Sequence, residues 1–172
     1  LIEEGLTGIV GPNGCGKSNI VESLRWCMGE TSAKSMRGSG MEDVIFSGTS
    51  NKPSKNIAEV SINLSNENKD GPLQYKELDE IEIRRKIEKD KGSKFYINNK
   101  EVRAKDAQMF FADLSTGAHS PSLISQGRIG ALVTAKPADR RAILEEAAGI
   151  AGLHVRRHEA ELRLSAAENN LK

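Results

Sequence analysis

Eight residues near the start of the chain, residues 11–18, constrain its fold more than any other stretch. They match the pattern Gly-x-x-x-x-Gly-Lys-Ser, whose glycines let backbone N–H groups turn inward and form an anion-binding nest. Lys17 would bring an ammonium group to the outer phosphates of a nucleotide, and Ser18 would offer a hydroxyl to Mg²⁺. The sequence therefore predicts a phosphate-binding loop for ATP and Mg²⁺. The binding residues we expect are Gly11, Pro12, Asn13, Gly14, Cys15, Gly16, Lys17, Ser18 and Asn19.

The residues on either side of this loop decide whether the pattern has the right context. Residues 6–10 are rich in β-formers and predict a short buried strand. After the loop, apolar residues recur at helical spacing up to Met28, and Gly29 is a plausible helix stop. Such a helix would direct the positive end of its dipole at the phosphates. The alternative is a glycine-rich turn between two core elements, which the combined motif and context disfavour.

Composition limits the other classes of function. The 172 residues suffice for one sizeable core, and 25 basic against 24 acidic residues give no general attraction to polyanions. No apolar run is long enough to span a membrane. The two cysteines lie in and just behind the loop, which favours reduced thiols and a cytoplasmic location.

The middle of the chain predicts mostly antiparallel strands. A short strand is expected at residues 44–46, and period-two alternation predicts strands at residues 58–64, 81–87 and 95–97, with another beginning at Val102. Turn signals between them indicate a β-meander. Residues 105–114 predict a helix whose apolar face carries Ala107, Phe110, Phe111 and Leu114.

The last third changes from strands to helices. A short apolar strand is expected at residues 123–124, and Pro137 suits the first position of a helix. Beyond it, apolar residues alternate at spacings of four and three from Leu153 to Leu171, with a polar interruption at Arg157. A single amphipathic helix would show the same pattern over so short a span. We expect a lobe over residues 1–150 and the start of a coiled-coil arm over residues 151–172.

Several motifs together resemble the N-terminal ATPase head of bacterial SMC (structural maintenance of chromosomes) proteins. Besides the phosphate loop, they are the segments at residues 34–38, 41–46, 124–127 and 140–150, in that order. The resemblance implies an α/β fold of the P-loop NTPase class: the N-terminal half of an ABC-type head, with an antiparallel meander and a helix entering a coiled coil. It implies an ATPase of chromosome condensation and segregation, whose two heads engage on binding ATP and part after hydrolysis.

The resemblance also assigns roles to two residues outside the loop. Gln126 matches the glutamine that contacts Mg²⁺ together with Ser18 and helps to place the attacking water. Arg37 matches an arginine that reaches the nucleotide in the engaged dimer, where a planar, always charged guanidinium suits phosphate. From the residues alone, Gln126 could equally be a polar residue at a strand end, and Arg37 a solvated loop residue.

Further implied partners are double-stranded DNA, a second SMC head, the C-terminal half-head of the same protein and a kleisin-type subunit at the nucleoid. Arg103 and Lys105 match positions that meet DNA in relatives, and residues 84–86 could extend that footprint. Neighbouring acidic residues dilute it, so a solvated strand face is the alternative. Gly40 stands where relatives often carry a lysine beside DNA.

Two motifs of a complete ABC-type site are not found after Gln126: a signature loop and an apolar run ending in Asp-Glu. Because phosphoryl transfer depends on positioning and charge neutralisation, we expect this chain to bind ATP and to hydrolyse it poorly alone. Three other functions are the head of a coiled-coil DNA-repair ATPase, the nucleotide-binding subunit of a transporter, and a coiled-coil fragment without nucleotide binding. The segment at residues 140–150 argues against the first, the intervening meander and the heptad helix against the second, and the intact phosphate loop against the third.

Overall fold

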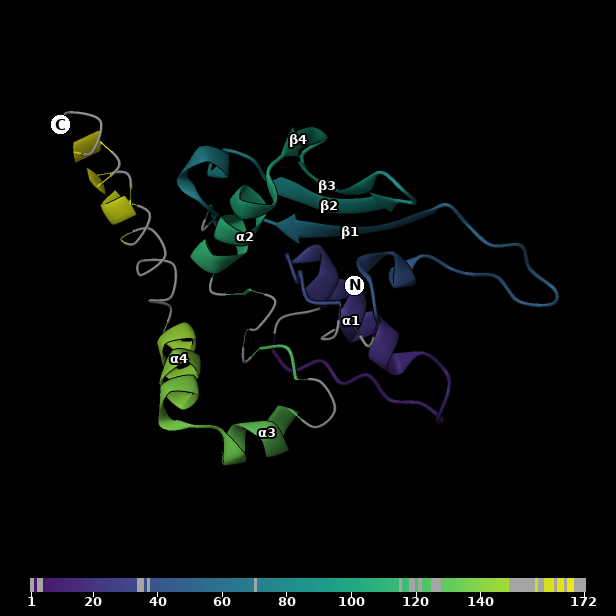
Figure 1. Ribbon diagram of the computed structural model, residues 1–172. Coiled ribbons are helices and arrows are strands. Elements are labelled where there is room, and N and C mark those ends of the chain that lie inside the picture. Colours follow the sequence, from purple (N-terminus) through teal and green to yellow (C-terminus); the bar gives the residue numbers. More distant parts are fainter. Residues whose placement is uncertain are drawn as a thin grey trace.

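The computed structural model describes most of the chain (Figure 1). The residues that it does not describe are 1, 3–4, 34–35, 37, 70, 115, 118–119, 121, 125–127, 149–156, 158–159, 163, 166 and 169–172. The expected boundary between lobe and arm at residue 150, and most of the expected coiled coil, therefore lie outside the described residues.

A four-stranded antiparallel sheet forms the centre of the fold, in the order β1-β2-β3-β4. Its strands are β1 (Ile57–Ser65), β2 (Glu80–Glu88), β3 (Gly92–Ile97) and β4 (Lys100–Val102). The register places Ile62, Ile83 and Ile97 opposite one another, so the apolar residues share one face. Asn98 and Asn99 both have positive φ, 47° and 64°, which matches the tight primed turn that a two-residue hairpin requires. The predicted meander is confirmed.

Two helices cover the apolar face of the sheet (Figure 1). Helix α1 (Lys17–Cys27) contributes Cys27, and α2 (Ala104–Asp113) contributes Phe110 and Phe111, to a cluster with Ile81 and Ile83. Both helices were expected from their periodicity. Helix α1 stops as predicted: Gly29 has a φ of 103°, which favours glycine.

The described part of the chain also contains the 3-10 turns η2 (Met41–Val44) and η3 (Leu73–Tyr75), and the helices α3 (Arg128–Thr134) and α4 (Pro137–Ala147). Pro137 begins α4, as predicted. Figure 1 shows α3 and α4 away from the sheet.

The strand prediction for residues 44–46 is wrong. Residues 41–44 instead form η2, because the Asp43 carboxylate accepts hydrogen bonds from the N–H groups of Ser39 (2.6 Å) and Gly40 (3.0 Å) and from the Ser39 hydroxyl (2.9 Å). The hydrogen bond from Gly40, reinforced by Ser39, holds the pKa of Asp43 below its usual value. This local capping competes with an extended backbone.

Two further strand predictions are wrong within the described residues. Residues 6–10 and 123–124 are irregular, and no described strand pairs with either segment. A strand needs a neighbour for its backbone hydrogen bonds, so β-forming side chains do not suffice. Residues 6–10 remain exposed, with Leu6 97% and Val10 91% accessible.

Candidate nucleotide site

The phosphate loop leads directly into α1, and two glycines shape the passage. Gly14 and Gly16 have φ of 80° and 89°, in the left-handed region that a side chain disfavours. Gly16 is also the N-cap of α1. Because Gly16 has no side chain, it cannot cap the helix as serine or aspartate would, and the first turn carries no acidic residue. The helix therefore presents N–H groups and positive dipole to whatever lies at its start.

The loop closes tightly on itself at its first residue. A Cβ added to Gly11 would lie 3.0 Å from Cys15 Sγ and 3.8 Å from Lys17 Cδ. A side chain here would crowd Cys15 unless the Cys15 side chain shifted, whereas at Gly14 and Gly16 glycine is favoured by the backbone conformation. Each glycine of the motif is thus favoured at its position for its own physical reason.

Lys17 folds back over this loop. Its Nζ donates to the carbonyls of Gly11 (2.6 Å) and Pro12 (2.5 Å) and lies 3.8 Å from Cys15 Sγ. These partners carry no formal charge, so the ammonium group adds its full charge to the mouth of the loop. The helix dipole and the ammonium thus converge on one place, which suits an anion of high charge.

The site residues expected from the motif are brought together, and the two outside it are not placed. Residues 11–16 form the loop and residues 17–19 the first turn of α1. The side chain of Ser18 is half-buried at the helix start. Such a glycine-shaped cradle fits a triphosphate, and the Ser18 hydroxyl suits a magnesium ligand. Arg37 and Gln126 both lie outside the described residues.

A hollow of about 310 Å³ lies beside α1. Asn19, Glu22 and Trp26 line it from the helix, and Met36 and Asp43 from the segment that follows. Its lining combines apolar surface with carboxylate acceptors, which suits a flat group bearing hydrogen-bond donors.

The two cysteines are free, Cys15 exposed in the loop and Cys27 buried beneath the sheet. Burial raises the pKa of the Cys27 thiol to about 11, so it stays protonated at neutral pH. Within the described residues no helix is both long and apolar enough to cross a membrane.

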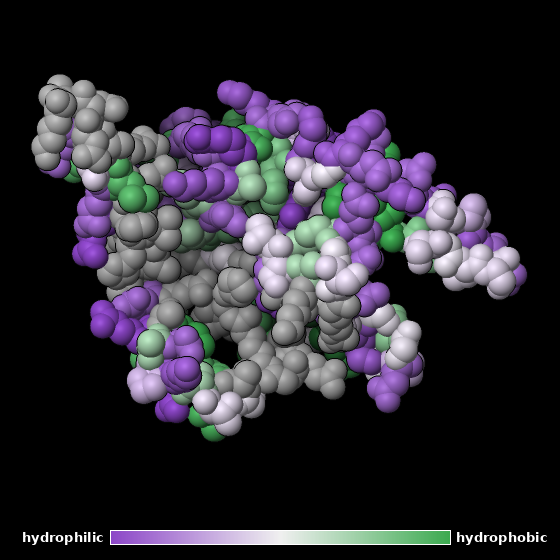
Figure 2. Space-filling model, in the orientation of Figure 1, coloured by the Kyte–Doolittle hydropathy of each residue, from purple (hydrophilic) through white to green (hydrophobic). Residues whose placement is uncertain are grey.

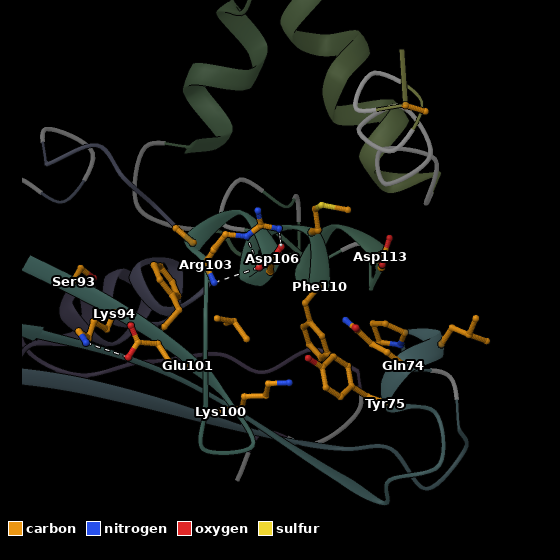
Figure 3. Close-up of a pocket in the computed structure, with 17 residues that line it drawn as sticks. Gln74, Tyr75, Ser93, Lys94, Lys100, Glu101, Arg103, Asp106, Phe110 and Asp113 are labelled. Carbon is orange, nitrogen blue, oxygen red and sulfur yellow. Dashed lines mark hydrogen bonds and ion pairs between the residues drawn. The ribbon is translucent and has the colours of Figure 1, made fainter. Parts of the chain in front are cut away.

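The expected DNA-contacting residues lie at the start of α2. Arg103 and Lys105 are exposed, and the Arg103 guanidinium donates to both carboxylate oxygens of Asp106, at 3.0 and 2.9 Å (Figure 3). This pairing holds the pKa of Asp106 below its usual value. Nearby, Lys94 pairs with Glu101 at 3.1 Å. Figure 2 shows hydrophilic residues across the upper part of the molecule, where Figure 1 places the sheet. The surface is charged but mixed in sign.

Arg85 does not belong to that surface, which corrects its inclusion in the footprint. It is only 3% exposed and points toward α1, whereas Arg84 and Lys86 alternate to the other face. The period-two pattern contained this signal, because Arg85 is in phase with Ile83 and Ile87. Because arginine is charged, it was expected on the surface despite this pattern.

The same arrangement of elements occurs in proteins of known class. A family model for the RecF/RecN/SMC N terminal domain matches residues 1–128, and the chain belongs to this family. The chromosome partition protein Smc of Cereibacter sphaeroides is 60% identical over 171 residues, which cover 99% of this chain and 15% of that protein. The chain thus spans about a seventh of this relative's length.

Two solved structures share the fold. One, from a study of ATP-driven dimerization and DNA-stimulated activation of SMC ATPases, matches with a TM-score of 0.69 and 32% identity over 85% of this chain and 86% of that one. The other is an Smc head domain with an extended coiled coil from Pyrococcus furiosus, bound to the C-terminal domain of ScpA. It matches with a TM-score of 0.72 and 31% identity over 93% of this chain and 39% of that one. The predicted α/β half-head of the P-loop class is confirmed.

Proposed function

We propose that this chain is the ATP-binding half of an SMC-type chromosome-segregation ATPase head. The observation that carries the proposal is the convergence of the Lys17 ammonium, the glycine-shaped loop and the uncapped start of α1 on one anion site. The 60% identity to a chromosome partition protein Smc supports this reading over a repair ATPase.

Each residue has a distinct task in this proposal. Lys17 moves from the carbonyls of Gly11 and Pro12 to bind the outer phosphates of ATP. The loop N–H groups donate hydrogen bonds to the remaining phosphate oxygens. Ser18 holds Mg²⁺, which would neutralise phosphate charge when bound, and Gln126 completes its coordination. Arg37 neutralises negative charge on the nucleotide that is bound between two engaged heads. The hollow beside α1 receives the base.

The missing catalytic groups come, in this proposal, from the C-terminal half-head of the same protein. Residues 6–10 support it, because these exposed, β-forming residues, which pair with no described strand, suit a strand whose neighbour belongs to another segment. A second head and a kleisin subunit would complete a cytoplasmic, nucleoid-associated assembly. ScpA is the protein bound to the Pyrococcus head.

Hydrolysis tests this division of labour. We expect the chain alone to release phosphate from ATP at background rate, and its mixture with the matching C-terminal half-head to turn over steadily. The measurement is phosphate release by each part and by the mixture, with Lys17→Ala as control. Steady turnover by the isolated chain that survives repurification and is lost in Lys17→Ala would refute the proposal.

DNA binding is proposed at Arg103 and Lys105, as phosphate contacts without sequence preference. On reconstituted ATP-engaged heads, two or three such cations predict a slope of log affinity against log salt of roughly −2 to −3. Replacing both residues with glutamate should flatten that slope and weaken binding on every sequence alike. ATP affinity should persist, although the Arg103 substitution places a second carboxylate beside Asp106.

The matched control for this charge change is the double substitution Lys52→Glu and Lys55→Glu, in the exposed loop before β1. It alters net charge equally, far from α2 in the chain. If affinity and slope respond alike in both double variants, the effect is one of overall charge and the assigned site is wrong.

A further inference from the structure

Arg85 is a charged residue in an apolar layer. Along β2, the inward positions are Ile81, Ile83, Arg85 and Ile87, and every one is at most 3% exposed. Burying a guanidinium costs free energy that an aliphatic side chain at this position would avoid. Simple packing of the sheet therefore does not account for it.

The contacts of Arg85 show what the charge does. Its Nη1 donates to the backbone carbonyls of Trp26 (2.6 Å) and Glu30 (2.7 Å), and Nε donates to Ser93 Oγ (2.8 Å). Its guanidinium carbon lies 4.5 Å from the Trp26 ring centre and 4.6 Å from that of Phe95. Burial lowers the pKa of Arg85 to about 10, so it remains cationic at neutral pH.

The two backbone carbonyls belong to the C-terminal end of α1 and the turn after it, whereas Ser93 belongs to β3. The Trp26 carbonyl also accepts from the Gly29 N–H (3.1 Å), and this end of the helix carries the negative end of the dipole, so a buried cation stabilises it electrostatically. The planar group between two rings also resists rotation. Arg85 thus joins β2 to the end of α1 in one defined orientation.

Other contacts also hold this C-terminal end of α1: Gln108 donates to the Gly29 carbonyl (2.8 Å), and Cys27 Sγ donates to the carbonyls of Val60 and Ile83 (3.5 Å each). Trp26 and Cys27, both in its last turn, are its buried residues, and the phosphate loop lies at the opposite end. Eleven residues span about 16 Å. A tilt of about 5° at the anchored end would therefore move the loop by more than about 1 Å, a displacement that matters for ligand geometry.

We propose that Arg85 is a positioning residue for the nucleotide site, which fixes the anchored end of α1 so that the loop meets the phosphates in one orientation. The inference rests on the proposed function, since it concerns the same site. If Arg85 only stabilised the fold, its substitution would lower the melting temperature alone. A positioning role predicts in addition a loss of ATP affinity in protein that is still folded.

The test uses the complete head, formed by this chain and its C-terminal half. Arg85→Met keeps the volume and removes the donors; Arg85→Lys keeps the charge without the forked donors. Ile97→Ala, on the same buried face, is the stability control. For each variant we would measure the melting temperature, ATP affinity well below melting, and hydrogen exchange of the amides at residues 24–30.

We expect ATP affinity to fall about tenfold in Arg85→Met and by less in Arg85→Lys, with faster exchange at residues 24–30, whereas Ile97→Ala lowers only the melting temperature. If Arg85→Met does not fold, the comparison of Arg85→Lys with Ile97→Ala decides. Equal affinity in the Arg85 variants and the wild type, or an equal loss in Ile97→Ala, would overturn the inference. Failure of the wild-type head to bind ATP would instead refute the proposed function.

Discussion

Replacing Lys17 with alanine is expected to weaken ATP·Mg²⁺ binding by on the order of 10- to 100-fold. A hydrogen bond to a charged group contributes roughly 1.5–3 kcal/mol, and each 1.4 kcal/mol changes affinity tenfold. The substitution removes the ammonium that lies over the loop, 2.6 Å from the Gly11 carbonyl, and keeps the backbone N–H groups at the start of α1, where Lys17 is the first residue. Equilibrium titration with labelled ATP measures the effect directly.

Lys89→Ala is the matched control for this experiment. Lys89 is an exposed lysine in the turn after β2, and its backbone N–H, which donates to the Asn56 carbonyl at 2.9 Å, is retained on substitution. The control removes one positive charge without touching the loop. Equal affinities for wild type and Lys17→Ala would show that the loop does not bind the nucleotide.

Replacing Phe111 with alanine should lower the free energy of unfolding by about 3–5 kcal/mol, the usual cost of deleting a buried aromatic ring. Phe111 is fully buried, and its ring packs edge-on against that of Phe110 with centroids 5.5 Å apart. Since whole domains are stable by only about 5–15 kcal/mol, this single change removes much of the total. Urea unfolding followed by the fluorescence of Trp26, the chain's one tryptophan, measures it.

The control for that substitution is Leu73→Ala, because Leu73 is 87% exposed in η3. Its removal should change stability by no more than about 0.5 kcal/mol. A loss of similar size in both variants would mean that the cluster around Phe111 is not the core that holds α2 on the sheet.

Local patterns predicted the elements whose partners lie close in the chain. Helices α1 and α2 and the meander follow from periodicity and turn residues, since each strand pairs with the next one along. The phosphate loop follows from its motif alone, because glycine, lysine and serine are each required by the chemistry of phosphate. The nucleotide-binding roles of the loop residues, Gln126 and Arg37 all stay predictions.

Patterns failed where the outcome depends on distant segments or competing local bonds. Residues 6–10 have the composition of a strand, but composition cannot supply the neighbour that a strand needs. At residues 44–46 three apolar residues were too few to outweigh the capping by Asp43. Arg85 shows a third kind of failure, in which charge suggested the surface while position in the strand indicated the interior.

Residues 6–10, which pair with no described strand, also have a consequence during synthesis of the protein. In a relative such as the Cereibacter protein, the matching segment is 15% of the length, and in the proposed architecture its strand partner is encoded near the far end. At roughly 5–20 residues per second, the ribosome would need about one to three minutes to reach that partner. Throughout this interval, neighbouring nascent chains on one messenger RNA expose identical β-forming segments to each other, the condition that favours aggregation. Chaperones that shield the emerging half-head would therefore be part of making this protein.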